Sequence, residues 1–365
     1  MRVLINRFRR IVHCTTILLL VCGCSDPNCN KDYLDSEEIA SVPSYFVEHL
    51  KDKEGQINNA IRTATEDYST LLFFTDAHWG MNQKNSPALI NHLFHFTSIG
   101  DVVFGGDVIT TSFKDPKDAI SLGKDFRHAF DAIGCNMYYL YGNHDNNSDE
   151  HPNEVERHLS DEQVYDYLQK GMGGCTYGGY FNFFFDRPES KTRFLCLDTG
   201  RYYYSQLREN TMGTVKFLIN ALNEIPDGWR IVLLSHIWAN LKSGEPYFTP
   251  FMTMIIHILD DFNAGKKGLF RYSGDSVQYD FSGALSKIVC CIGGHCHLDS
   301  ILYSEGGIPI IITTTDSRQT INGETADIGT VDEQAVSVFV FDYTNGFIKL
   351  FRVGRGHDIE VPISS

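Results

Sequence analysis

The sequence predicts an α/β domain in which two packed sheets are flanked by helices. Short apolar runs alternate with longer amphipathic stretches through the first half of the chain, and this strand–helix–strand order implies parallel pairing. Near residue 345, two apolar runs flank Asn345-Gly346, a pair typical of a tight hairpin turn, which implies an antiparallel part. Together the two kinds of pairing favour mixed sheets within one domain.

Ten apolar runs are expected to form strands, and five segments are expected to form helices. The predicted strands cover residues 71–75, 102–105, 137–141, 175–186, 193–198, 230–235, 288–292, 308–315, 336–343 and 347–353. The predicted helices cover residues 87–99, 118–133, 160–170, 215–224 and 251–261. Glycine directly follows the first three helices, as is common at helix ends, and Ser160 to Gln163 form a capping-box pattern. The segment 239–287 is long for a connection between strands, so we expect it to carry structure and to shape a substrate pocket.

The first residues have the pattern of an export signal. Four arginines precede an apolar run at 11–21, which is shorter than the ~20 residues that span a bilayer. Val21-Cys22-Gly23-Cys24 then resembles a bacterial lipobox, whose signal is cut before a cysteine that becomes lipidated. An ordinary secretory signal cut nearby is the alternative. We therefore expect a lipoprotein signal peptide at 1–23, a polar, acidic tether at 24–40 and a single domain at 41–365, anchored through Cys24 in a bacterial cell envelope.

Charge and cysteine content limit the classes of function. The 365 residues have a formal net charge of -15, which disfavours a broad nucleic-acid-binding face because such faces need clustered Lys and Arg. Of the ten cysteines, seven follow residue 24, scattered through apolar runs. This odd count favours buried free thiols over a disulfide framework.

Polar side chains recur where five of the predicted strands end. The endings are Asp76-Ala77-His78, Gly105-Gly106-Asp107, Gly142-Asn143-His144-Asp145, His236, and Gly293-Gly294-His295-Cys296-His297. A single such ending is more often a polar turn, since Asn, Gly and Asp are the usual turn residues. Five endings at the C-terminal ends of strands, where open α/β sheets bind ligands, indicate a shared site.

The residue types at these endings predict a metal centre. In Asp-x-His and His-x-His, two extended residues two apart point the same way and can address one ion. Carboxylate, imidazole and amide oxygen suit borderline or fairly hard divalent ions such as Mn, Fe or Zn. About seven such groups exceed the needs of one tetrahedral site, so two ions sharing a bridging carboxylate are expected.

The ordered set DAH, GGD, GNHD, SH and GHCH resembles the calcineurin-like metallophosphoesterase family over roughly residues 70–300. The resemblance implies a four-layer α/β/β/α sandwich of two mixed sheets flanked by helices, with two metal ions at the C-terminal ends of the strands. It implies that a metal-bound hydroxide hydrolyses a phosphate monoester or diester. By position, Asp76, His78 and His297 would hold one ion, Asn143, His236 and His295 the other, and Asp107 would bridge them.

The resemblance also assigns a role to His144, which matches the family's histidine beside the phosphate and would assist the leaving alkoxide. In some branches a second aspartate, three residues after the bridging one, orients that histidine; here the position is Thr110, so the orienting partner must come from elsewhere or be missing. Asp145 is expected to fix its own loop. Asn240 and Arg201 are candidate substrate contacts, with loop packing as the alternative.

These patterns predict a metal-dependent phosphoesterase of the cell envelope. Its expected cofactors are two divalent metal ions. Its expected partners are a phosphorylated small molecule or an envelope phosphodiester, and the membrane through the lipid anchor. The alternatives are a non-catalytic surface lipoprotein on the same scaffold, disfavoured by the complete ligand set, and a nuclease of the same family, disfavoured by the acidic charge.

Overall fold

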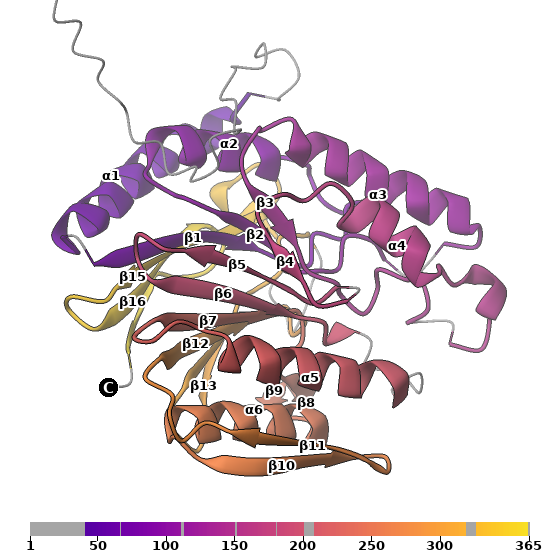
Figure 1. Cartoon of the computed structure of the whole chain (residues 1–365). Helices are drawn as coiled ribbons and strands as arrows, with labels where there is room; N and C mark the ends of the chain where they lie inside the picture. The colour runs from indigo at the N-terminus through magenta and orange to yellow at the C-terminus, as the bar shows by residue number, and fades with distance from the viewer. Residues whose placement is uncertain are drawn as a thin grey trace, which may run out of the picture.

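The computed structural model of the chain describes residues 41–65, 67–110, 113–149, 152–179, 181–200, 208–318 and 326–363. The predicted signal peptide and tether, with Cys24, and the candidate contact Arg201 lie outside the described residues. Two mixed sheets lie face to face and helices cover the outer face of each, as Figure 1 shows, so the predicted four-layer α/β/β/α sandwich is confirmed.

The first sheet has the strand order β17-β16-β15-β1-β2-β3. Its strands are β1 (Tyr68–Phe74), β2 (Val102–Phe104), β3 (Met137–Tyr139), β15 (Ala335–Asp342), β16 (Phe347–Gly354) and β17 (Ile359–Pro362). The strands β1, β2 and β3 pair in parallel, whereas β15 joins β1 antiparallel and forms the predicted hairpin with β16.

The second sheet has the strand order β13-β14-β12-β7-β6-β5-β4. Its strands are β4 (Thr176–Tyr177), β5 (Phe183–Arg187), β6 (Thr192–Leu197), β7 (Arg230–Ser235), β12 (Lys287–Gly293), β13 (Ser300–Tyr303) and β14 (Pro309–Ile312). The parallel core is β6, β7, β12 and β14. The run predicted as one strand over 175–186 is instead divided into β4 and β5, which pair antiparallel across a turn.

Strand alternation separates three apolar layers. In β1, Leu72 and Phe74 pack against the helices α1 (Val47–Thr63), α2 (Ser86–Phe96), α3 (Pro116–Asp131) and α4 (Asp161–Leu168), while Leu71 and Phe73 point between the sheets. On the other side, residues of β7 alternate between the layer of α5 (Arg208–Asn223) and α6 (Pro250–Asn263) and the same inter-sheet layer. Each buried strand therefore contributes apolar side chains to two layers, which is why these strands read as continuous apolar runs.

The long segment before β12 contains ordered elements, as expected. It consists of the hairpin β8 (Asn240–Lys242) and β9 (Glu245–Tyr247), then α6, then the hairpin β10 (Lys267–Tyr272) and β11 (Asp275–Asp280). In Figure 1, α6 lies against the outer side of the second sheet, and the β10–β11 hairpin contacts α5 and α6.

Among the described cysteines, Cys196, Cys290, Cys291 and Cys296 are buried, as expected for most of them, and Cys135 and Cys175 are partly buried. Across the described residues, no helix combines the length and the apolarity that crossing a membrane requires.

Candidate metal centre

The seven predicted ligands come from five strands whose C-terminal ends meet at one edge of the sandwich. Asp76 and His78 follow β1, Asp107 follows β2, and Asn143 follows β3; these three strands are parallel neighbours in the first sheet. In the second sheet, His236 follows β7, and His295 and His297 follow its parallel neighbour β12. The topology alone therefore delivers all seven side chains to one place.

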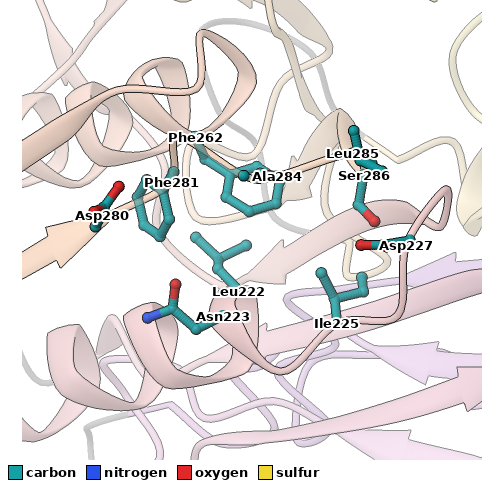
Figure 2. Close-up of a pocket in the computed structure, with 11 residues that line it drawn as sticks. Leu222, Asn223, Ile225, Asp227, Phe262, Asp280, Phe281, Ala284, Leu285 and Ser286 are labelled. Carbon is teal, nitrogen blue, oxygen red and sulfur yellow. The ribbon is translucent and has the colours of Figure 1, made fainter.

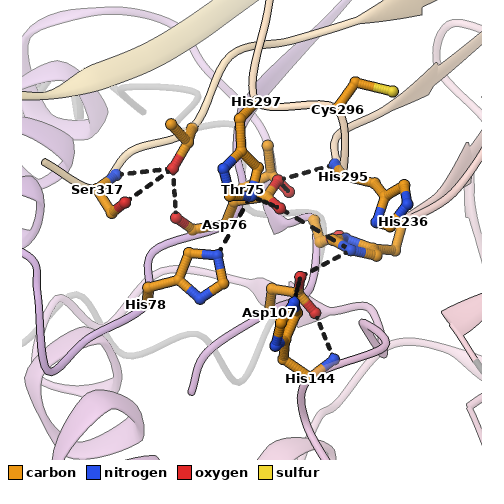
Figure 3. A network of polar contacts seen from close by, with 12 residues as sticks. Thr75, Asp76, His78, Asp107, His144, His236, His295, Cys296, His297 and Ser317 are labelled. Carbon is orange, nitrogen blue, oxygen red and sulfur yellow. Dashed lines mark hydrogen bonds and ion pairs between the residues drawn. The ribbon is translucent and has the colours of Figure 1, made fainter. Parts of the chain in front are cut away.

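The side chains form two groups that share a carboxylate (Figure 3). One group is Asp76, His78, Asp107 and His297, and the other is Asp107, His236 and His295. Within each group, one ligand atom from every residue lies within 4.8 Å of the others. The two groups bring together six of the seven residues that the resemblance implies as ligands, all except Asn143, and Asp107 is common to both.

Each of the two carboxylates uses one oxygen to bind the protein and leaves the other without a hydrogen bond. Asp76 Oδ2 accepts from Thr75 Oγ1 (2.6 Å) and His295 N (3.0 Å), and Asp107 Oδ1 accepts from His144 N (2.9 Å). Asp76 Oδ1 and Asp107 Oδ2 are buried and accept no hydrogen bond from the residues that the structure describes. They lie 2.9 Å from His297 Nε2 and 3.1 Å from His236 Nε2, respectively. Buried carboxylate oxygens of this kind need a cation, so the donor set fits divalent metal ions.

Two of the histidines are held with their Nε2 atoms toward the centre. The carbonyl oxygens of Gly105 and Ile109 lie 2.8 Å from His236 Nδ1 and 3.2 Å from His78 Nδ1. A carbonyl oxygen can only accept, so each Nδ1 carries a proton, and the neutral form of each ring presents a lone pair at Nε2. His78 Nε2 and His297 Nε2 lie 3.2 Å apart, a spacing that a shared cation between them explains.

Asn143 completes the second group with an amide oxygen. Its Oδ1 lies 3.2 Å from His236 Nε2, its side chain is buried, and its Nδ2 has no hydrogen-bond partner within the described part of the chain. An amide oxygen that faces the lone pair of a neutral imidazole is repelled by it, and a proton on Nε2 or a metal ion between the two atoms removes this repulsion. The arrangement therefore fits a ligand to the same ion as His236.

The backbone at the centre is strained. Five of the seven predicted ligands have positive φ angles: Asp76 (54°), His78 (38°), Asp107 (61°), His295 (70°) and His297 (54°). This region is uncommon for residues other than glycine, costs about 1–3 kcal/mol at each position, and clusters at functional sites. These positive φ angles turn the chain sharply after the strand, so that both ligands of an Asp-x-His or His-x-His pair face the centre.

At the centre, burial and the neighbouring charges act in opposite directions on the pKa values of several ligands. Burial lowers the pKa of His78 and of His295 to about 3, helped by the neighbouring His297 and His236, respectively. Burial also acts against protonation of His236, but Asp107 and Asp76 outweigh it and raise its pKa to about 10. Burial raises the pKa of Asp76 and of Asp107, yet the histidines prevail and hold both below the usual range. A proton on His236 thus stands in for part of the charge that divalent ions would supply.

Asp145 fixes the two loops that carry Asp107 and Asn143. Its buried carboxylate accepts from Gly142 N (2.8 Å), Asp107 N (3.1 Å) and Val108 N (2.7 Å), which confirms the expected loop-fixing role. A side chain at Gly142 would collide with Asp107 Oδ1 and Asp107 N, so only glycine allows this close approach.

His144 lies beside the centre rather than within either group. Its ring packs edge-on against His78, and its Nε2 lies 3.8 Å from Asp107 Oδ2. The residue that approaches this ring is Asp149, whose Oδ2 lies 3.2 Å from His144 Nε2. In the sequence, Asp149 is marked only as an acid five residues after the histidine, in a loop already rich in polar residues.

The remaining candidates lie away from the ligand groups or make other contacts. Asn240 is partly buried at the start of β8, and its Oδ1 accepts from Leu241 N at 2.8 Å, so its substrate contact stays a prediction. Cys296 is buried and its Sγ lies 3.3 Å from Ala239 O, in agreement with its expected burial rather than metal binding. A cavity of ≈ 160 Å³ is lined by residues that include Leu222, Phe281 and Ser286 (Figure 2), near the starts of β7 and β12, whereas the ligands follow the ends of these strands.

Comparisons with known proteins agree with the fold and leave the family open. The chain matches no family model and no curated protein. Among solved structures, it is similar to a dimetal phosphatase from Danio rerio, with a TM-score of 0.54 and 12% identity over 81% of this chain and 99% of that one. A phosphopantetheinyl hydrolase from Mycobacterium tuberculosis matches 69% of this chain and 91% of its own at 13% identity, but its TM-score of 0.37 carries no argument. The chain therefore shares its fold with a dimetal phosphatase.

Proposed function

We propose that the chain is a phosphoesterase that uses two divalent metal ions to hydrolyse a phosphate ester. The observation that carries this proposal is the shared carboxylate: Asp107 belongs to both ligand groups, and its buried Oδ2 accepts no hydrogen bond from the described residues. A carboxylate between two histidine-rich groups is the arrangement that holds a pair of ions close together. The fold shared with a dimetal phosphatase supports the same conclusion.

The proposed ligands of the first ion are Asp76, His78 and His297, and those of the second are Asn143, His236 and His295, with Asp107 bridging. When bound, such ions lower the pKa of a water molecule and neutralise charge on the phosphoryl oxygens. The protein contributes rigid orientation. Backbone carbonyls fix two imidazoles, and Asp145 fixes two loops.

His144 is proposed to act on the leaving group. Its Nε2 lies 3.8 Å from the metal-facing oxygen of Asp107, and its side chain is 20% exposed, so it borders both the centre and solvent. An imidazole N–H in this position can donate a hydrogen bond to the oxygen that departs as the ester is cleaved.

The deciding experiment measures metal content and hydrolysis together. The purified protein is loaded with Mn, Fe or Zn, its bound metal is quantified, and a panel of phosphate monoesters and diesters is assayed with and without chelator. We expect about two equivalents of metal and hydrolysis that chelator abolishes. Asp107→Asn should lose both, whereas Asp186→Asn, which alters an ion pair with Arg193 on β6, should lose neither. Near-zero metal and no chelator-sensitive hydrolysis with all three ions would reject the proposal.

The place of action is proposed from the N-terminal pattern. The basic residues, the short apolar run and the Gly23-Cys24 pair support a lipid anchor on Cys24 in a bacterial envelope. Such a location favours envelope or scavenged phosphate esters as substrates. Metabolic labelling with a radioactive fatty acid should mark the expressed protein and fail to mark Cys24→Ser. Equal labelling of both would overturn the anchor.

A further inference from the structure

The segment after β14 lies beside the metal centre and contacts two of the predicted ligands. β14 pairs in parallel with β12, so the residues that follow the two strands reach the same edge of the second sheet. Thr314 Oγ1 donates to the carbonyl oxygen of His297 at 2.9 Å, and Thr315 Oγ1 donates to that of Asp76 at 2.7 Å. Both threonines are buried. The bond from Thr315 joins the two sheets, because Asp76 follows β1 of the first sheet.

The two carbonyl groups belong to residues whose backbone is strained. Asp76 and His297 both have a φ angle of 54°, in the left-handed region. Residues other than glycine keep this conformation only where the surrounding contacts hold it. A buried carbonyl group needs a donor, so a hydrogen bond from a separate segment stabilises the turn that places the carbonyl there. Thr75, next to Asp76, receives a similar contact, since Asp316 N donates to its carbonyl oxygen at 2.9 Å.

The segment that carries the two threonines is itself held by polar contacts. The buried carboxylate of Asp316 accepts from Ala335 N, where β15 begins, at 2.9 Å and from Gln334 Nε2 at 2.8 Å. Ser317 N donates to Thr315 Oγ1 at 3.1 Å. The hydroxyl of Thr315 is thus fixed by one backbone group while it donates to another. A donor anchored in this way cannot follow a displaced ligand residue, so it restrains that residue.

We propose that Thr314 and Thr315 are positioning residues for the ligands of the first ion. Neither hydroxyl touches the ion. Each holds the main chain of a ligand residue, His297 or Asp76, and so fixes the direction in which that side chain leaves its turn. The two side chains already meet, with Asp76 Oδ1 2.9 Å from His297 Nε2, and rotation of either turn would separate them. The proposal rests on the proposed two-metal function, and it assigns the two hydroxyls to the affinity of one ion rather than both.

Metal affinity tests the proposal without reference to turnover. Thr315→Val keeps the branched shape of the side chain but removes its hydroxyl, so the carbonyl oxygen of Asp76 loses its donor. The variant and the wild type are dialysed against a series of free Mn²⁺ concentrations, and the bound metal is quantified. The affinity for one ion should fall about 10-fold, as when a ligand loses an outer contact, and that for the other should change less than about threefold. Thr315→Ser keeps a donor and should restore the affinity to within about threefold of the wild type.

Two more variants separate positioning from general damage. Thr314→Val, at the other carbonyl, should weaken the same ion, and it supplies the result if Thr315→Val does not fold. Thr253→Val is the matched control, because Thr253 Oγ1 donates to the carbonyl oxygen of Thr249 at 3.0 Å within α6. This control should change the affinity for neither ion.

Ligand variants identify the ion that is weakened. In His78→Ala, which removes a ligand of the first ion, adding Thr315→Val should not weaken the ion that remains. In His295→Ala, which removes a ligand of the second ion, adding Thr315→Val should still weaken the remaining ion about 10-fold. Equal losses for both ions, no loss in either valine variant, or no recovery in Thr315→Ser would overturn the proposal.

Hydrogen exchange of the metal-free protein separates this proposal from the proposed function. In the turn after β1, His78 N donates to Asp107 O at 3.1 Å and Trp79 N donates to Val108 O at 2.7 Å. Thr315→Val should speed exchange of these amides about 10-fold, while amides of α6 keep their wild-type rates. Unchanged exchange in the turn would refute the positioning role, whatever the metal content. A wild type that binds no metal and hydrolyses no ester would instead refute the proposed function, and the exchange rates would still decide whether Thr315 holds the turn.

Discussion

Replacing Asp145 should cost stability and metal together, because its carboxylate is the common acceptor for the loops after β2 and β3. Three buried backbone N–H groups, from Gly142, Asp107 and Val108, donate to it at 2.7–3.1 Å, and the residue is fully buried. Asp145→Ala leaves all three without an acceptor. Each buried unsatisfied donor costs about 1–3 kcal/mol, so the expected destabilisation is about 3–9 kcal/mol, with water entry giving the low end.

Asp145→Asn should be milder but still damaging. Gly142 N and Asp107 N donate to Oδ2, and Val108 N donates to Oδ1. An amide retains one oxygen, so either orientation sets its NH₂ group against at least one backbone donor. The expected loss is about 1–4 kcal/mol, near one to two unsatisfied groups.

The assay is thermal and urea unfolding of the chelator-treated protein, so that bound metal does not contribute to the measured stability. For a domain of this size, 1 kcal/mol shifts Tm by about 1.5–2 °C. Asp145→Ala should therefore unfold at least about 4 °C lower and bind less metal than the wild type. Asp166→Asn, which removes an exposed ion pair with Lys170, is the control and should shift Tm by less than about 1 °C. A loss below about 1 kcal/mol for Asp145→Ala, with full metal content, would refute the reasoning.

Three other outcomes are expected. Asn143→Ala should release about one equivalent of metal, whereas His144→Ala should keep both and lower kcat for an alkyl ester about 10²–10⁴-fold; metal loss in His144→Ala would contradict the assigned roles. Burial raises the pKa of Asp316 from its ordinary value of 3.8 to about 6 in the folded chain, so the folded state binds the proton more tightly than the unfolded state does. The free energy of unfolding that this protonation contributes to the wild type is lost as the pH rises from 4 to 6. Asp316→Asn should thus be less destabilising at pH 7 than at pH 4 by about 2–4 kcal/mol in urea titrations, and a pH-independent difference would count against it. Gly55→Ala, at an exposed position inside α1 with open space around the added carbon, should raise the unfolding free energy by about 0.5–1 kcal/mol; a decrease would show that the helix surface is not as described.

Helix prediction succeeded where local signals were strong. Ser160 caps α4 by accepting from Gln163 N while the Gln163 side chain returns to the Ser160 backbone, as the capping-box pattern predicts. The helix α1 was not predicted, because its polar sequence buries only a few residues, such as Leu50 and Ile57, on one narrow face. Its stability comes from packing on β15 and β16, which lie almost 300 residues away in the sequence.

The acidic residue near His144 could not be identified from the sequence, in which Thr110 occupies the position of the expected aspartate. The pattern of endings identified His144 and the missing aspartate, but no spacing rule singles out Asp149. Its carboxylate reaches the ring only because the loop after His144 folds back through contacts of Asn147 with Phe113 and Arg157. These contacts join segments that are separate in the sequence, so they are visible only in three dimensions.

The candidate ligands were readable from the chain because each one directly follows an apolar strand, and both features are local. Alternation along a buried strand, glycine at a tight turn and a polar residue after it require no knowledge of distant segments. The strand order, the meeting of Asp107 with both ligand groups and the partner of His144 depend on long-range packing. Burial and distance depend on how the layers pack against one another. This packing, which residue types alone do not specify, brings the five polar strand ends together at one centre.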